Sequence, residues 1–430
     1  MEKRKLKELI VTHTKSVLKR HKLIKRQVLN LPRIIEKKET VIITGVRRCG
    51  KSSLMIIILN DLIDQKKVSA DNILYINFED ERFVEFTHKD FETLYECYLE
   101  LNNPHGKKYL FFDEIQNIPY WEKWIHRMYE FEEVKTFITG SNATLLSGEI
   151  AAALTGRNIS LSLFPFSFKE LLTKNEISID QNMIYDREYR VLLKRYFEVY
   201  MEFGGFPEVL ISKDDSILQN YFKDILYRDI VARYSIRNIK QIKELSLYLA
   251  DNIGNLCSYR NLARTISANS TSTIKNFLDH LENAYLFFRL GLFDYSLKKQ
   301  MYNPSKIYSV DTALARSMAF RFTRDTGRIC ENIVFLELIR LGKEIYYWKS
   351  TQHYEVDFLI KEGLKVVEII QVCSDVSQKE TQNREIRAAL QAASEFGLNK
   401  ASIITEDFSG ELMKNGVEIA FIPLWQWLIA

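Results

Sequence analysis

An eight-residue segment with two glycines constrains this chain more than any other feature. Gly45-Val-Arg-Arg-Cys-Gly-Lys-Ser52 fits the pattern G-x-x-x-x-G-K-[ST] without a mismatch. It lies between the apolar run 41–44 and the apolar run 54–63, so the order is strand, glycine loop, helix. Glycines let the backbone wrap an anion, and the following helix points its positive end at the same place. The alternative, an ordinary turn, does not explain these flanks. The predicted phosphate-binding residues are Gly45, Val46, Arg47, Arg48, Cys49, Gly50, Lys51, Ser52 and Ser53.

Two adjacent acids supply the expected partner of this loop. Asp113 and Glu114 follow the apolar run Tyr109–Phe112. We expect Ser52 and Asp113 to hold Mg²⁺ and Lys51 to contact the β- and γ-phosphates. Glu114 is then placed to orient or deprotonate a water molecule, which favours ATP hydrolysis over transfer to a second substrate. Without the glycine loop, an acidic pair at the end of a strand would be interpreted only as a structural cap.

Three further polar residues are candidates for the same site. Ser141 and Asn142 follow the next apolar run and could contact the γ-phosphate or the attacking water, although Gly-Ser-Asn also suits a plain turn. Arg157 is a candidate for transition-state charge, acting in its own chain or in a neighbouring copy of a homo-oligomer. The alternative for Arg157 is a surface arginine. Arg47 and Arg48 are assigned to phosphate or to a partner.

The alternation of apolar runs with helical stretches predicts the fold of this region. Further strands are expected at 73–78, 109–112, 135–138 and 159–163, with helices around 91–101 and 121–130 between them. This order is typical of a parallel sheet with crossover helices, an α/β P-loop NTPase core. Ligands in such sheets bind beyond the carboxyl ends of the strands. We expect Trp121 and Trp124 to be core residues.

The remainder of the chain predicts three more parts. Residues 171–250 read as a helical lid, and 251–318 read as a winged helix-turn-helix with helices at 259–266 and 272–285 and a wing from 286–292 and 306–310. Exposed cations and polar side chains there could contact double-stranded DNA, and a protein partner is the alternative. These are Arg260, Arg264, Lys275, Lys298 and Lys299, with Ser270, Thr271, Ser272 and Asn276 available for base edges.

Composition limits the class of protein. The chain has 430 residues, of which 46% are hydrophobic and 27% charged, so intrinsic disorder is excluded. Residues 1–37 hold twelve Lys or Arg and three Glu, and they predict a basic amphipathic helical segment, 1–38, that either attracts acidic partners or is simply solvated. The five cysteines show no metal-binding spacing, and no apolar run is long enough for a membrane span. We expect a cytoplasmic protein without a membrane association.

The order of motifs resembles AAA-type ATP-binding proteins of bacteria and archaea that carry a C-terminal restriction-endonuclease-like domain of unknown function. The similarity covers about 40–425. It implies an ATPase core at 39–170, followed by the lid, the winged helix and a nuclease-like α/β domain at 319–430. The matching segments are GVRRCGKSSL, YLFFDEIQNI, YWEKW, TGSNATLL, LTGR, FPFSFKEL, GGFPEV, YRDIVARY, ENIVFLEL and EVDFLI.

The nuclease part of this resemblance is incomplete. Asp357 fits the first metal-binding carboxylate of that fold, and Glu331 or Glu337 could add one from a helix. The next strand should carry E-x-K, but it contains Glu368 and Gln371, which point to opposite faces because strand side chains alternate. One metal-binding role is therefore missing. The sequence leaves open a degenerate scaffold that binds DNA or protein, an ATP-gated nuclease, and a signalling or defence switch without DNA.

Overall fold

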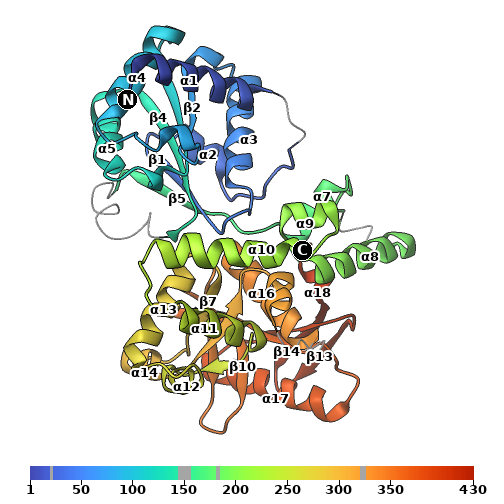
Figure 1. Cartoon of the computed structure of the whole chain (residues 1–430). Helices are drawn as coiled ribbons and strands as arrows, with labels where there is room; N and C mark the ends of the chain where they lie inside the picture. Colours follow the sequence, from blue (N-terminus) through green and yellow to red (C-terminus); the bar gives the residue numbers. More distant parts are fainter. Residues whose placement is uncertain (20–22, 144–155, 181–184, 320–325) are drawn as a thin grey trace. The chain divides into compact units, whose positions relative to one another are not determined.

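The structure is a computed structural model that describes residues 1–19, 23–143, 156–180, 185–319 and 326–430. Parts of two motifs, at 144–146 and 154–155, lie outside the described residues. The chain divides into two compact units, residues 1–164 and residues 165–430 (Figure 1). Across the described ranges, none of the helices has both the length and the apolar character that a bilayer-spanning segment needs.

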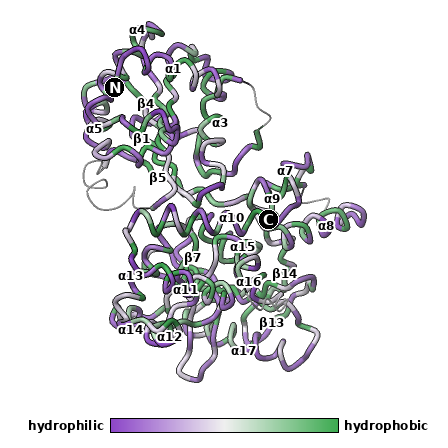
Figure 2. The backbone as a smooth tube through the Cα atoms, in the orientation of Figure 1, coloured by the Kyte–Doolittle hydropathy of each residue, from purple (hydrophilic) through white to green (hydrophobic). Residues whose placement is uncertain are grey.

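The N-terminal unit is built on a five-stranded sheet. Its strand order is β2-β3-β4-β1-β5, and every neighbouring pair is parallel, as the alternating pattern predicts. Each strand therefore ends at the same edge, where the polar clusters follow. Figure 2 shows the hydrophobic character of β1 and β4 in the middle of the sheet. The strands are β1 (Thr40–Thr44), β2 (Ile73–Asn77), β3 (Lys108–Asp113), β4 (Val134–Gly140) and β5 (Asn158–Ser162).

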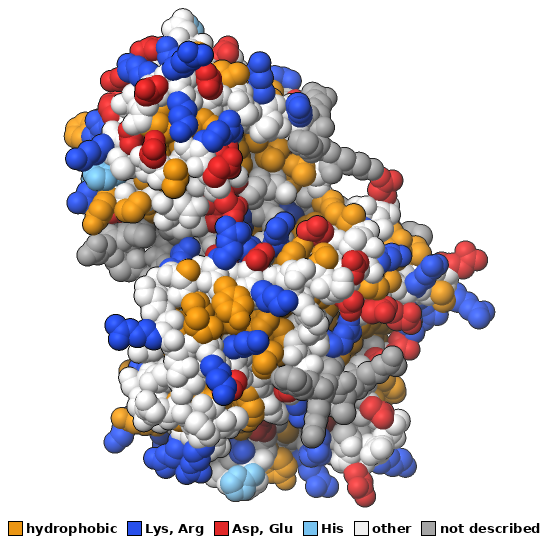
Figure 3. All heavy atoms as spheres, in the orientation of Figure 1, with side chains coloured by type: hydrophobic (Ala, Val, Ile, Leu, Met, Phe, Trp, Pro, Cys, Tyr) orange, Lys and Arg blue, Asp and Glu red, His pale blue; other side chains and the backbone are white. Residues whose placement is uncertain are grey.

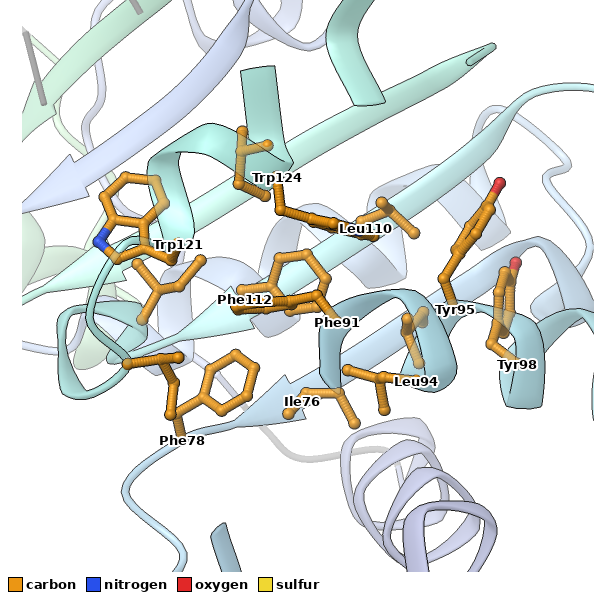
Figure 4. Packing of buried hydrophobic residues seen from close by; sticks show 14 of the residues in the cluster. Ile76, Phe78, Phe91, Leu94, Tyr95, Tyr98, Leu110, Phe112, Trp121 and Trp124 are labelled. Atoms are coloured by element: carbon orange, nitrogen blue, oxygen red, sulfur yellow. The ribbon is translucent and has the colours of Figure 1, made fainter. Parts of the chain in front are cut away.

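In the described part of this unit, α-helices α1 to α5 accompany the sheet, and short 3-10 turns lie at Ala70–Asn72, Glu81–Phe83 and Ile115–Asn117. Trp124 stacks on Phe91 with ring centroids 5.1 Å apart, and Trp121 is 2% exposed, so both tryptophans are core residues as predicted (Figure 4). The helices are α1 (Lys3–Leu18), α2 (Leu31–Glu36), α3 (Lys51–Asp64), α4 (Asp90–Asn102) and α5 (Trp121–Phe131).

The basic N-terminal segment is part of this unit. Helix α1 packs against β2 and α4. Leu6, Ile10 and Val17 are buried on one face of the helix, which confirms the amphipathic pattern. Two lysines of this helix pair with acids of α4: Lys3 with Glu96 at 3.0 Å and Lys7 with Glu100 at 2.6 Å. Part of the segment's positive charge is therefore balanced within the unit.

The C-terminal unit begins with helices. Residues 185–250 are mostly helical and are interrupted at Gly204–Phe206, as the sequence predicts. The helices are α7 (Phe168–Lys174), α8 (Arg187–Phe203), α9 (Pro207–Ser212), α10 (Ile217–Asp224), the π-helix η6 (Ile225–Ala232) and α11 (Ile239–Asp251).

Two helices, α12 and α13, and an antiparallel strand pair follow. The pairing of the two strands predicted around 286–292 and 306–310 is confirmed, because β7 pairs with β8, and β6 joins on the other side of β8. A short helix, α14, lies between β7 and β8, which the sequence reading did not place. The elements are β6 (Leu256–Cys257), α12 (Tyr259–Thr265), α13 (Thr271–Asn283), β7 (Phe287–Leu290), α14 (Leu297–Tyr302) and β8 (Ser305–Ser309).

The last part of this unit is a six-stranded mixed sheet of order β13-β14-β12-β11-β10-β9. Helix α17 packs on β10, β11 and β12, and its alanines contribute to the core. The strands β13 and β14 were not predicted. The elements are α15 (Thr312–Met318), α16 (Thr326–Arg340), β9 (Glu344–Lys349), β10 (Glu355–Glu362), β11 (Lys365–Val372), α17 (Lys379–Phe396), β12 (Lys400–Thr405), β13 (Gly410–Lys414), β14 (Val417–Pro423) and α18 (Leu424–Trp427).

Candidate functional site

The glycine loop joins the end of β1 to the start of α3. A Cβ atom at Gly45 would lie 2.1 Å from the carbonyl oxygen of Leu163, so any side chain there would displace the backbone. Gly50 has φ 101°, in the region that favours glycine, and α3 begins at the next residue. Both glycines of the pattern are therefore required by the geometry. The loop leaves the N-terminus of α3 at the carboxyl edge of the sheet, where an anion would meet the helix dipole.

Lys51 closes over this loop. Its ammonium donates hydrogen bonds to the carbonyl oxygens of Gly45 at 3.0 Å and Val46 at 3.2 Å, and it lies 3.7 Å from a carboxylate oxygen of Glu114. The side chain is 5% exposed. The Lys51 ammonium is thus held between the loop and the acid pair, where the terminal phosphates of a nucleotide would bind.

Asp113 lies at the end of β3 in a fully buried network. Its carboxylate accepts hydrogen bonds from Tyr75 at 2.9 Å and from Thr139. The Ser52 hydroxyl favours the charged form of this carboxyl. Burial, and then repulsion from Glu114, raises the pKa of the Asp113 carboxyl above its ordinary value. A divalent cation would offset that cost. Because the Ser52 hydroxyl and the Asp113 carboxylate are hard oxygen ligands, and Ser52 is close enough to favour the charged form of Asp113, they fit Mg²⁺.

Glu114 is held in an unusual backbone conformation. Its φ is 51°, in the left-handed region, and its backbone N–H donates to the Thr139 hydroxyl at 2.9 Å. Gln116 donates to one oxygen of its carboxylate. The other oxygen faces Lys51. A left-handed backbone in a residue other than glycine costs energy and is often kept where a side chain must be aimed.

Ser141 and Asn142 follow β4, which lies between β3 and β1. Since Gly140 pairs with Thr44, both residues lie beside the start of the glycine loop. They are 1% and 0% exposed, respectively. The sheet order therefore brings these polar residues between the loop and the acid pair.

The structure places Arg157 away from the other predicted site residues. It precedes β5, and its carbonyl accepts from the backbone N–H of Thr40, the first residue of β1. The glycine loop follows Thr44, one strand length further on, roughly 15 Å at the usual rise per residue. A contribution of Arg157 to its own site was therefore a wrong expectation, because Arg157 lies at the amino edge of the sheet. Its guanidinium pairs there with Glu130 at 2.6 Å.

The other loop residues serve different purposes. Val46 and Cys49 are fully buried, and the Cys49 thiol donates to the carbonyl of Leu163 at 3.3 Å. Arg47 pairs with Glu79, beyond β2, at 2.9 Å. Arg48 has φ 71°, and Ser53 is half-buried on α3. The structure thus places the outer part of the loop against protein groups, Lys51 at its buried inner side and Ser52 on the exposed surface at the start of α3.

Arg26 is a residue of this site that the sequence reading missed. It is 7% exposed, and its guanidinium donates to the carbonyl of Cys49 at 2.8 Å and to the carbonyl of Phe164 at 2.7 Å. It therefore ties the glycine loop to the chain that leaves β5. Arg26 lies in a segment rich in Lys and Arg, so the sequence does not distinguish it from the neighbouring cations. Thr139 and Tyr75 were also missed, since each stands inside an apolar strand.

The nuclease-like residues are only partly brought together. Asp357 and Gln371 lie opposite each other on β10 and β11, and Glu331 comes close from α16. Glu337 instead pairs with Arg340, and Glu368 points away from Asp357, so neither belongs to the group. Glu385 of α17, which the sequence did not single out, accepts from the Gln371 amide at 2.6 Å.

Family comparisons agree with the geometry of the loop. A family described as an AAA domain matches residues 37–172. Domains of unknown function match 194–325 (DUF8612) and 326–426 (DUF4143). An uncharacterized protein of Methanocaldococcus jannaschii is 35% identical over 99% of this chain and 96% of its own length. The chain belongs to the same family. Another relative, an uncharacterized protein of Haemophilus influenzae, is 30% identical over 92% of this chain and 96% of its own.

Solved structures resemble this family member only distantly. The Orc1 protein of Aeropyrum pernix in complex with DNA matches with a TM-score of 0.30 and 13% identity, over 74% of this chain and 90% of that one. AMPPCP-bound DnaA from Aquifex aeolicus matches with a TM-score of 0.26 and 13% identity, over 59% and 84%.

Proposed function

We propose that the AAA domain binds ATP with Mg²⁺, hydrolyses it, and acts as a nucleotide-driven switch coupled to a DNA-facing C-terminal half. The observation that carries the proposal is the joined network of loop and acid pair. Lys51 spans Gly45 and Glu114, while Asp113 accepts hydrogen bonds from Tyr75 and Thr139 of the adjacent strands. An ordinary turn has no reason to bury this set together.

The residues divide the chemistry among themselves. Backbone N–H groups of 45–52 and the Lys51 ammonium would hold the phosphates. Ser52 and Asp113 would hold Mg²⁺, which supplies neutralisation of charge on the β- and γ-phosphate oxygens. Glu114 would orient a water and take its proton, and Asn142, beside it, would hydrogen-bond the γ-phosphate or that water. Arg157 could supply positive charge only to the ATP site of a neighbouring copy of the chain.

The test of hydrolysis is the Glu114→Gln variant. It keeps the shape of the side chain but cannot accept the proton, so we expect ATP binding to persist and turnover to stop. Glu133→Gln, an exposed change just before β4, is the matched control and should leave turnover unchanged. If Glu114→Gln turned over ATP at the rate of the control, Glu114 would not be the group that activates water.

The DNA-facing part of the proposal rests on charge around the helix-turn-helix. Arg260, Arg264 and Lys275 are exposed on α12 and α13. Lys and Arg side chains gather over the region of α12 and α14 on the face shown in Figure 3. The acids Asp279 and Glu282, which would dilute this charge, are both paired with Arg289 of β7. A cationic face with paired acids suits a phosphate backbone.

A second candidate function is a signalling or defence switch that binds a protein partner without DNA. Salt-dependent binding to double-stranded DNA separates the two. We expect the affinity to fall steeply between about 50 and 200 mM salt, as it does when several phosphates are contacted. If the chain binds duplex DNA no better than a neutral protein does, the protein-partner function is favoured. We do not extend the proposal to cleavage, since one metal-binding role is missing from β11.

A further inference from the structure

The C-terminal unit encloses a buried ammonium among carboxylates. Lys306, on β8, is 4% exposed. Its Nζ lies 2.7 Å from Asp357, 3.0 Å from Glu355 and 3.0 Å from Glu331. Two of these acids come from β10 and the third from α16. A single cation thus joins three separate elements at the position where a nuclease of the resembled fold would hold its metal.

The other oxygen and amide atoms of this group are occupied as well. The second oxygen of Asp357 accepts from the backbone N–H of Val372 at 2.9 Å. Glu331 also accepts from Tyr308 at 2.7 Å. The Gln371 side chain accepts from the backbone N–H of Asp357 at 3.0 Å and donates to Glu385. Both oxygens of Asp357 therefore have a partner without any further ion.

The residues present do not fit a divalent metal ion. Ile369, whose side chain shares the face of Gln371 on β11, is fully buried in the apolar core where the second carboxylate would be needed. Within the described part of the chain, no three Asp, Glu, His or Cys side chains are arranged to hold a metal. A metal beside Asp357 would also lie next to the Lys306 ammonium, and two cations at such a distance repel.

We propose that the Lys306 ammonium is a resident cation that replaces the divalent metal of the nuclease-like site, so that the C-terminal domain is metal-independent and does not cleave. Attraction to the three surrounding carboxylates offsets the free energy that the ammonium loses when it is removed from water. It also fastens β8, a strand of the helix-turn-helix part, to α16 and β10. The site thereby becomes a structural clamp within the C-terminal unit.

The clamp predicts a latent metal site. Lys306→Met removes the charge with little change of volume and leaves three carboxylates without a cation. A cavity of about 240 Å³, lined by Glu355, Asp357 and Gln371, gives a metal ion access to two of these carboxylates. Once the ammonium is removed, the acids that now surround it can close on the ion. We expect the full-length Lys306→Met variant to bind one Mn²⁺ per chain, and the additional change Asp357→Asn to abolish that binding.

The titration uses Mn²⁺ without nucleotide, in a chain that carries Asp113→Asn so that the ATP site does not contribute. The matched control is Lys349→Met, which removes a half-exposed lysine 3.7 Å from Glu355. It should bind no Mn²⁺. A folded Lys306→Met variant that also binds none would overturn the proposal. The proposal would also be overturned if the Asp113→Asn chain, with Lys306 in place, bound Mn²⁺ and lost that binding when Asp357→Asn was added. This second comparison needs no change at Lys306, so it decides the question even where that variant fails to fold.

Discussion

The Arg26→Ala variant tests how the glycine loop is held in place. The guanidinium is buried and donates to two backbone carbonyls, at 2.8 Å to Cys49 and 2.7 Å to Phe164. A hydrogen bond to a charged group contributes about 1.5–3 kcal/mol, so the two together contribute about 3–6 kcal/mol. In a domain of 150–250 residues, 1 kcal/mol shifts the Tm by about 2–4 °C. We expect the N-terminal unit to melt at least about 6 °C lower.

The same variant should bind ATP more weakly. The bond to Cys49 fixes the loop, and its loss of about 1.5 kcal/mol or more corresponds to about tenfold weaker affinity. Calorimetric melting and ATP titration measure the two effects. Lys25→Ala, at the exposed neighbouring position, is the control, and Arg26→Lys should fall between, because one ammonium cannot replace the planar guanidinium at both carbonyls. If Arg26→Ala melts and binds ATP like Lys25→Ala, Arg26 does not position the loop.

Three further predictions concern charge. Burial, and then repulsion from Asp357, raises the pKa of Glu331 to about 7, so this carboxyl adds its full negative charge to the Lys306 clamp only above that pH. Because the unfolded chain releases the proton near the ordinary value of 4.5, stability should fall as the pH rises from 4.5 to about 7, and Glu331→Gln should flatten that slope in urea unfolding. Arg264→Ala should lower the slope of log affinity for DNA against log salt by about 1, whereas Lys365→Ala, an exposed change on β11, should not. Arg157→Ala should reduce ATP turnover only at protein concentrations where copies of the chain assemble, which a concentration series would show.

Much of the fold and of the candidate site could be predicted from local sequence patterns. The glycine loop is a contiguous segment whose backbone demands determine its residues, and the acid pair directly follows a buried strand. Both could be predicted because the chemistry and the structure are encoded within a few neighbouring positions. The strands at 73–78, 109–112 and 135–138 were found for the same reason: an apolar run between turns is a local signal.

Contacts between distant segments could not be read in this way. Arg26 lies 138 positions from Phe164, and Lys306 lies 51 positions from Asp357, so neither pairing leaves a local pattern. Arg157 shows the opposite error. Its motif resembles a functional one, but its position before β5 places it at the amino edge of the sheet, away from the phosphate site.

Titration of ATP and Mg²⁺ into the purified full-length chain by calorimetry tests the central claim most directly. The network around Lys51 predicts binding of one ATP per chain, and loss of that binding in Lys51→Met, with Lys66→Met as the control on the exposed surface after α3. Heat of binding that is equal in the two variants, or the absence of any heat with the unaltered chain, would contradict it.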